Sequence, residues 1–556
     1  MAFTVTMDHA GAHSFHVTAH CDGLAGELQD FKLPAWSPGY YRILDYAKYV
    51  SNFQARDGAG HALAWEKVTK NTWRVVAAGS AVVDLSYDVY GAVSFAVQNY
   101  FGEDRALLSP PGTFVHLAGH TERPVTITLT PPANWTTFAT GLDPVAGRPH
   151  TFRATNFDVL YDSPILMGTQ ELLRFEVHGV PHEVAMEFVP AAVDRQKIVA
   201  DLKKMVETAA QLIGDVPYTR YAFLMIGKGN GGVEHLNSAS IAFNGESLLK
   251  EASYRGWLSY VAHEYFHNFN VKRIRPIALG PFDYDSENLT NMLWVSEGLS
   301  VYYQDVVTER AGLMTRAQYL EKLQGAMAKF ENAPGHRYQS ATESSWNTWG
   351  TSGVGNDRNT TISYYDNGGL LGMMLDLKIR HESRNRKSLD DVMRALYRKY
   401  YQQKQRGFTD AEFREECEAA AGTSLTEVLE YASTTKEADY AKYLAYAGLT
   451  LEITAEDAPG ASLRLNTRTL ANGNLAVVEG PAGLAAGDEI VSTPKALNDA
   501  MSAKQPGETL SLRIRRGGVE QAVELTLEKN QKRTFTIQPV ASPDAVQAAI
   551  LKDWLQ

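Results

Sequence analysis

The segment His-Glu-Tyr-Phe-His at residues 263–267 constrains this chain of 556 residues more than any other part of its sequence. In an α-helix, residues four apart lie on the same face, so the imidazoles of His263 and His267 can bind one metal ion together. Glu264 lies about 100° round the same helix, close enough to reach a water beside the ion without being a ligand. The pattern predicts one zinc ion per chain, with Glu264 as the general base.

An alternative interpretation is a helix that carries two histidines on its surface. Apolar neighbours favour a buried helix instead: Trp257, Leu258, Val261, Phe266 and Phe269. Buried histidines need polar partners, and a metal ion serves both rings. We expect the third ligand to be Glu297, because an acidic residue inside the apolar segment LWVSEGLSVYY is costly unless it is paired or coordinating. A buried salt bridge to an arginine is the alternative for Glu297.

The chain divides into regions with different patterns. Residues 1–180 hold short segments rich in β-branched and aromatic residues, separated by glycine and proline turns, which predicts an antiparallel, sandwich-like β domain. Residues 181–445 are mainly helical, residues 446–540 return to β patterns, and residues 541–556 form a C-terminal tail. The fold class is therefore multidomain α+β.

Within the helical region, apolar residues repeat with helical spacing over 194–213, where Gly214 is a natural stop. The polar, glycine-rich residues between Glu331 and Tyr364 predict a long loop. Further helices are expected at 247–268, 295–310, 315–332 and 409–420.

Composition excludes several classes of protein. The formal net charge is −11, from 53 basic and 64 acidic residues, so neither a nucleic-acid footprint nor a polybasic membrane patch is present. No apolar run is long enough to span a membrane. Cys21 and Cys417 are far apart in sequence, which argues against a disulfide scaffold. The N-terminus lacks a signal-peptide pattern, which predicts a cytoplasmic protein, although a trimmed signal would leave the same start.

The motif HEYFH followed by WVSEG resembles the gluzincin metallopeptidases, in which a glutamate is the third zinc ligand. In the aminopeptidase N group the interval between these motifs is shorter than the 29 residues between His267 and Glu297, which points to a sister family. The chain is similar to the glycyl aminopeptidase family in AWSPGYYRILDYAKYV (35–50), YDSPILMGT (161–169) and HEYFHNFNVKRIRP (263–276). This resemblance implies a β-rich N-terminal domain, a thermolysin-like catalytic domain and a C-terminal PDZ domain.

The resemblance also implies further site residues. Gly231-Gly232-Val233-Glu234 is similar to a strand of related aminopeptidases whose backbone pairs with the peptide and whose glutamate holds the free α-amine. We therefore expect Gly231, Gly232 and Glu234 to bind substrate. The residue types suit this role, because glycines let a backbone approach closely and a carboxylate attracts a cation. A flexible acidic loop is the alternative.

A tyrosine motif of the related enzymes is similar to Tyr364-Tyr365-Asp366-Asn367-Gly368. Matching the tyrosines makes Tyr365 the hydroxyl that stabilises the oxyanion. Tyr364 competes for this role, because the lysine of the related motif is Asn367 here. Core packing is the alternative for either tyrosine.

Two further features leave alternatives open. Lys272, Arg273 and Arg275 either anchor a peptide carboxylate or phosphate, or have a structural role in the domain, which we favour. The sequence from Gly480 resembles a bacterial PDZ domain, which either binds a peptide as an added strand or only braces its neighbour.

These observations predict a zinc-dependent aminopeptidase that acts on peptides with a free N-terminus and removes small residues, with glycine and alanine implied by the family. One alternative is a zinc endopeptidase whose cleft is open beyond Glu234. Another is a PDZ-based protein-binding scaffold with structural zinc, which would need a fourth protein ligand that the sequence does not offer.

Overall fold

In the computed structural model, the chain forms two compact units. The first contains residues 1–289, 303–313 and 396–409, and the second contains residues 290–302, 314–395 and 410–556. None of the helices described is both long and apolar enough to cross a lipid bilayer. The structure describes residues 1–8, 11, 13–227, 231–350, 355, 357–470 and 472–555.

The first unit begins with three β-sheets around one apolar core, which confirms a β-rich N-terminal domain. Their strand orders are β13-β14-β11-β1-β2-β7-β4, β10-β3-β6-β5 and β12-β15-β9-β8. Strand β2 buries every second residue, as expected for a sheet with one face on a core. The bounds are β1 Ala2–Thr6, β2 Ser14–Cys21, β3 Leu28–Lys32, β4 Val50–Asp57, β5 Trp65–Thr69, β6 Thr72–Val76, β7 Val83–Tyr90, β8 Tyr100–Phe101, β9 Arg105–Leu108, β10 His116–Leu117, β11 Val125–Thr130, β12 Thr137–Thr140, β13 Asp143–Pro144, β14 Thr151–Ala154, α1 Phe157–Tyr161 and β15 Ile165–Gly168.

The prediction that this domain is antiparallel is wrong for one pair of strands among the described residues. β1 and β11 run parallel, with Ala2 opposite Thr126 and Thr6 opposite Thr130. Parallel pairing requires a long crossover, and the whole of β2 to β10 lies between these two strands. The residue pattern of a single strand reports burial but not direction, so the sequence did not reveal this pairing.

A five-stranded mixed sheet of order β16-β17-β18-β20-β19 follows in the first unit. Helix α2 links β17 to the parallel strand β18; it begins after the N-cap Asp194 and ends before Gly214, as predicted. Strand β19 lies at the edge of the sheet, and helix α3 follows β20. The bounds are β16 Glu171–Val177, β17 Val180–Met186, α2 Arg195–Ile213, β18 Tyr221–Gly227, β19 Gly232–Glu234, β20 Ser238–Phe243 and α3 Glu251–Phe266.

The second unit is rich in helices, and α4 contributes residues to both units. Thr315 and Gln318 form the predicted capping box of α5. The expected loop between Glu331 and Tyr364 contains helix α6, which corrects the prediction; its start is the capping box of Ser340 and Glu343. The bounds are a π-helical turn at Trp294–Gly298, α4 Leu299–Arg310, α5 Arg316–Glu331, α6 Ala341–Trp346, α7 Tyr364–Glu382, α8 Leu389–Leu396, α9 Asp410–Ala421, α10 Thr426–Ser433 and α11 Tyr440–Ala445.

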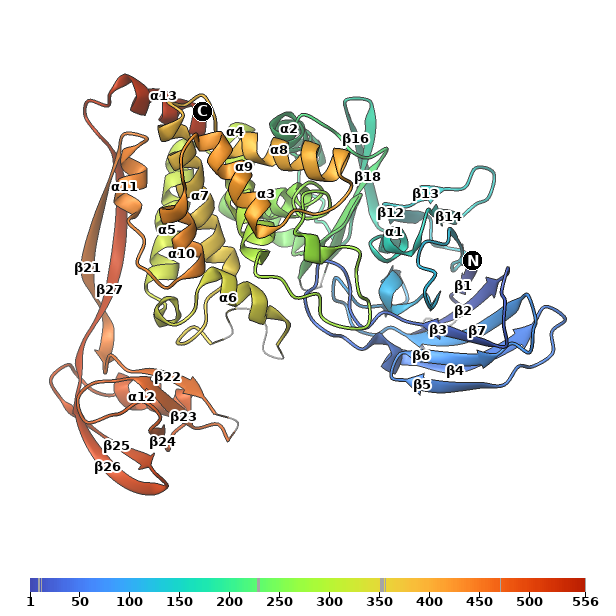
Figure 1. The fold of residues 1–556 in the computed structure, drawn as a ribbon, viewed down its shortest axis with the longest axis horizontal. Helices are drawn as coiled ribbons and strands as arrows, with labels where there is room; N and C mark the ends of the chain where they lie inside the picture. Colours follow the sequence, from blue (N-terminus) through green and yellow to red (C-terminus); the bar gives the residue numbers. More distant parts are fainter. Residues whose placement is uncertain are drawn as a thin grey trace. The chain divides into compact units, whose positions relative to one another are not determined.

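The C-terminal part of the second unit contains a two-stranded ribbon of β21 and β27, drawn side by side in Figure 1. Between these strands in sequence lies a five-stranded antiparallel sheet of order β22-β23-β24-β25-β26, together with helix α12. Helix α13 in the C-terminal tail buries Trp554. The bounds are β21 Leu449–Ser462, β22 Asn466–Thr469, β23 Leu475–Glu479, β24 Glu489–Ile490, α12 Pro494–Ser502, β25 Thr509–Arg516, β26 Val519–Thr526, β27 Glu528–Pro539 and α13 Ala545–Trp554.

Candidate metal centre

Helix α3 carries the His-Glu-Tyr-Phe-His motif at its C-terminal end. Aromatic and aliphatic side chains of α3, among them Trp257 and Val261, are buried. His263 is 6% exposed, Glu264 4% and His267 1%. Three polar side chains so deeply buried need partners, because an uncompensated buried polar group costs several kcal/mol, about 1–3 even by mutational measures.

The two histidine rings are oriented for joint ligation. His267 Nδ1 lies 2.6 Å from the carbonyl oxygen of Asn270, which can only accept, so Nδ1 carries the proton and donates it. The lone pair of His267 is therefore on Nε2, and that atom lies 3.0 Å from Nε2 of His263. Two nitrogen ligands of a tetrahedral zinc ion, each about 2.0–2.1 Å from it, lie about 3.3 Å apart.

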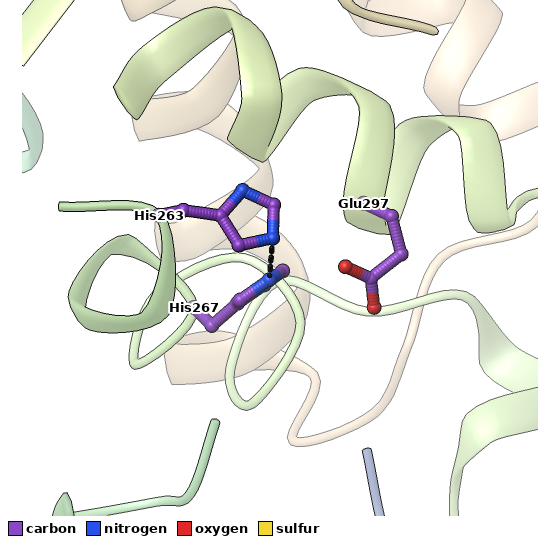
Figure 2. Close-up of side chains that lie close together, drawn as sticks. All are labelled: His263, His267 and Glu297. Carbon is purple, nitrogen blue, oxygen red and sulfur yellow. Dashed lines mark hydrogen bonds between the residues drawn. The ribbon is translucent and has the colours of Figure 1, made fainter. Parts of the chain in front are cut away.

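Glu297 completes a group of three buried donors. One ligand atom from each of His263, His267 and Glu297 lies within 4.8 Å of the others. In Figure 2 the carboxylate of Glu297 points towards the two imidazoles. Glu297 is 2% exposed and comes from the π-helical turn, a distortion found often at functional sites. Two imidazoles and one carboxylate are a donor set that suits zinc and leaves a fourth position for a substrate or water.

A second group of donors joins this centre to strand β19. One oxygen each of Glu234 and Glu264 and one nitrogen of His267 lie within 4.8 Å of one another, and all three residues are buried. β19 is an edge strand, so the backbone groups on its outer side are not paired with another strand of this sheet. Gly39, in the segment 35–50, also lies close to Glu234. A Cβ added at Gly39 would lie 2.8 Å from both carboxylate oxygens of Glu234.

Gly232 leaves room for two side chains of α3. A Cβ at Gly232 would collide with the hydroxyl of Tyr260 and would lie 2.7 Å from Oε1 of Glu264. Tyr260 precedes Glu264 by one helical turn, so both side chains lie on the same face of α3. Tyr260 is not among the residues predicted for the site; its spacing from Glu264 was the available signal. Gly231 has a positive φ of 80°, which favours glycine.

We expect Gly232→Ala to lower kcat about tenfold or more while leaving the fold intact. Its backbone does not require glycine, and the new methyl would displace the ends of two side chains rather than main chain. A small displacement of a catalytic carboxylate can cost about a hundredfold. The measurement is steady-state kinetics beside thermal unfolding. Gly256→Ala in α3 is the matched control, because nothing lies within 4 Å of a Cβ there; equal activity losses in both variants would contradict this expectation.

The predicted tyrosine motif packs beside the turn that carries Glu297. A Cβ at Gly298 would collide with Gly368, and a Cβ at Gly368 would lie 2.6 Å from the carbonyl oxygen of Trp294, so the two backbones touch. Glycine in a helix interior costs about 1 kcal/mol relative to alanine, and at these two positions it allows the close approach of the two segments.

The two candidate tyrosines differ in their surroundings. Tyr364 is buried, and its hydroxyl lies 3.3 Å from Oγ1 of Thr348. Tyr365 is half-buried and stacks on Tyr364, with ring centroids 4.8 Å apart. Tyr365 is therefore the more exposed residue of the pair.

Two of the three basic residues after the motif have structural partners. Lys272 Nζ lies 2.9 Å from Asp162 Oδ1 and 3.7 Å from Glu234 Oε1. Burial alone would raise the pKa of Asp162, but Lys272 and His235 outweigh it and hold that pKa below its ordinary value. Arg273 donates to the carbonyl oxygens of residues 217, 236 and 268.

Comparison with known proteins identifies two matching domains. The Peptidase M61 N-terminal domain matches residues 2–169, and the M61 glycyl aminopeptidase domain matches residues 256–371. Together they cover half of the chain. No curated protein that was compared matches the chain.

Solved structures are similar over most of the chain. An aminopeptidase N family protein from Idiomarina loihiensis is 26% identical, with all of both chains covered and a TM-score of 0.84. An M1 zinc metallopeptidase from Deinococcus radiodurans is 12% identical over 79% of this chain and 94% of its own, with a TM-score of 0.50. A mutant of that enzyme bound to Tyr-Ser-Ala has a TM-score of 0.51 at 13% identity, with the same shares covered. At these low identities, the two Deinococcus radiodurans structures show only that the fold is similar.

Proposed function

The chain belongs to the M61 glycyl aminopeptidases, a family of metallopeptidases, and on this premise we propose that it is a zinc-dependent aminopeptidase. The substrates are peptides with a free N-terminus. The bond hydrolysed is the one after the first residue, and the family implies glycine and alanine at that position.

The observation that carries this proposal is the placement of Glu234. Its carboxylate lies in one buried group with Glu264 and His267, within 4.8 Å. A substrate ammonium held by Glu234 therefore brings the first peptide bond beside Glu264, and a bond deeper in the chain would lie farther away. This distance argument favours removal of single residues over internal cleavage.

Each residue of the site then has a role. His263, His267 and Glu297 hold Zn²⁺, which when bound acts as a Lewis acid and lowers the pKa of water. Glu264 takes a proton from the attacking water at its carboxylate and passes it to the departing amine nitrogen. Gly231 and Gly232 let the peptide backbone approach β19, and Tyr365 donates a hydrogen bond to the oxyanion.

The test of this proposal compares peptides with free and N-acetylated amines. We expect acetylation of an alanine or glycine peptide to lower kcat/KM by about a hundredfold or more, because it removes the cation that pairs with a buried carboxylate. Glu234→Gln should lower kcat/KM on the free peptide and narrow the difference between the two peptides. Equal cleavage rates of free and acetylated peptides would support the endopeptidase instead.

We also propose that residues 446–540 are a PDZ domain that binds a peptide ligand. β22 is an edge strand, and a groove of about 450 Å³ is lined by Leu465 and Thr467 and by Leu497 and Met501 of α12. An extended peptide can pair with the edge of β22 and place a side chain against α12.

A further inference from the structure

One cavity in the first unit has a strongly positive lining. Its volume is about 530 Å³, and half of its lining residues are cations while the others carry no charge. These cations are Lys272, Arg273, Arg275 and Arg406. No carboxylate lines the cavity among the described residues, although the whole chain has an excess of acidic residues. Such a local concentration of one charge attracts an ion of the opposite sign.

Two of these cations, Arg273 and Arg275, form no ion pair among the described residues, whereas Lys272 is paired with Asp162. Arg273 donates to carbonyl oxygens and forms no ion pair among the described residues, so its charge is not neutralised. Arg275 likewise forms no ion pair in the described part of the chain. The guanidinium of Arg275 packs against Gly280. A Cβ added at Gly280 would collide with the guanidinium carbon and both terminal nitrogens. The lack of a side chain at Gly280 therefore leaves room for this cation.

Burial lowers the pKa of Arg275, and the nearby charge of Asp158 offsets this only in part. A guanidinium has five N–H donors in a planar fork, which suits the oxygens of carboxylate or phosphate. Lys272 and Arg275 also line a neighbouring cavity of about 120 Å³ that Glu234 borders, so the positive cavity adjoins the Glu234 site.

We propose that the cavity bordered by Arg273, Arg275 and Arg406 binds an oxyanion, either a carboxylate or a phosphate group. This site is separate from the metal centre and does not depend on the proposed peptidase activity.

The test measures binding of inorganic phosphate and, separately, of acetate to the zinc-loaded full chain by calorimetry at constant ionic strength. We expect saturable binding of one ion per chain. Gln405→Glu places a carboxylate in the lining of the cavity at an exposed position without changing side-chain shape, and should weaken binding about tenfold. Arg275→Gln should also weaken it, with thermal unfolding as the check on folding.

The matched control is Arg398→Gln, which removes an exposed cation of the same segment that does not line the cavity. Binding in this variant should equal that of the wild type. Saturable binding of either ion that Gln405→Glu weakens supports the proposal, and the ion that binds more tightly identifies the group. Absence of binding by both ions overturns it, and so does an equal loss of affinity in the Gln405 and Arg398 variants. Phosphate bound at the zinc ion would be insensitive to Gln405→Glu, so that result would also overturn it.

Discussion

Glu264→Gln is expected to lower kcat by about 10²–10⁴-fold while leaving KM within a few-fold of the wild-type value. Glu264 is 4% exposed and lies in one group with Glu234 and His267, and the proposed role of its carboxylate is to move a proton at the reacting bond. General acid–base catalysis by a positioned side chain contributes this range of rate. The amide keeps the shape of the side chain but cannot accept the proton. Single-turnover and steady-state kinetics on a free-amine peptide are the measurements.

The control for this variant is Glu251→Gln, an exposed glutamate in the first turn of the same helix. Its activity should be unchanged. Zinc content of the Glu264 variant should equal that of the wild type, because Glu264 is not among the proposed ligands. Full activity in Glu264→Gln would remove the proposed base and favour a scaffold in which the metal is structural.

The sequence brought together the residues of the candidate metal centre because its signals are local. His263 and His267 are four residues apart on one helix, and their apolar neighbours indicated burial. Glu297 was recognisable because an acidic residue in an apolar helical segment requires a compensating partner. A single sequence is sufficient for inferences that rest on periodicity and burial.

The features that were not predicted from the sequence depend on contacts between distant segments. Tyr260 and Gly232 meet although 27 residues separate them, and nothing in either segment alone indicates the contact. The touching glycines at 298 and 368 and the parallel pairing of β1 with β11 have the same origin. Helix α6 is different, because its capping box was present in the sequence and the surrounding polarity obscured it.

Glu297→Gln is expected to lower zinc affinity by at least about a hundredfold and to abolish activity at low zinc concentrations. Loss of a partner that only orients a ligand already costs about 10–100-fold, and loss of a charged ligand should cost more. Elemental analysis after dialysis gives the metal content. Zinc binds the folded state, so zinc should raise the Tm of the metal-depleted wild type but raise that of this variant much less.

Glu287→Gln provides the matched comparison, because Glu287 is the neighbouring glutamate between His267 and Glu297 and is exposed. It should retain zinc, activity and the zinc-dependent rise in Tm. A chelator should inactivate both the wild type and Glu287→Gln, and added zinc should restore them. If Glu297→Gln instead holds zinc as tightly as Glu287→Gln does, the third ligand is another residue, and the closeness of Glu297 to the two imidazoles has a different cause, such as a hydrogen bond to a protonated histidine.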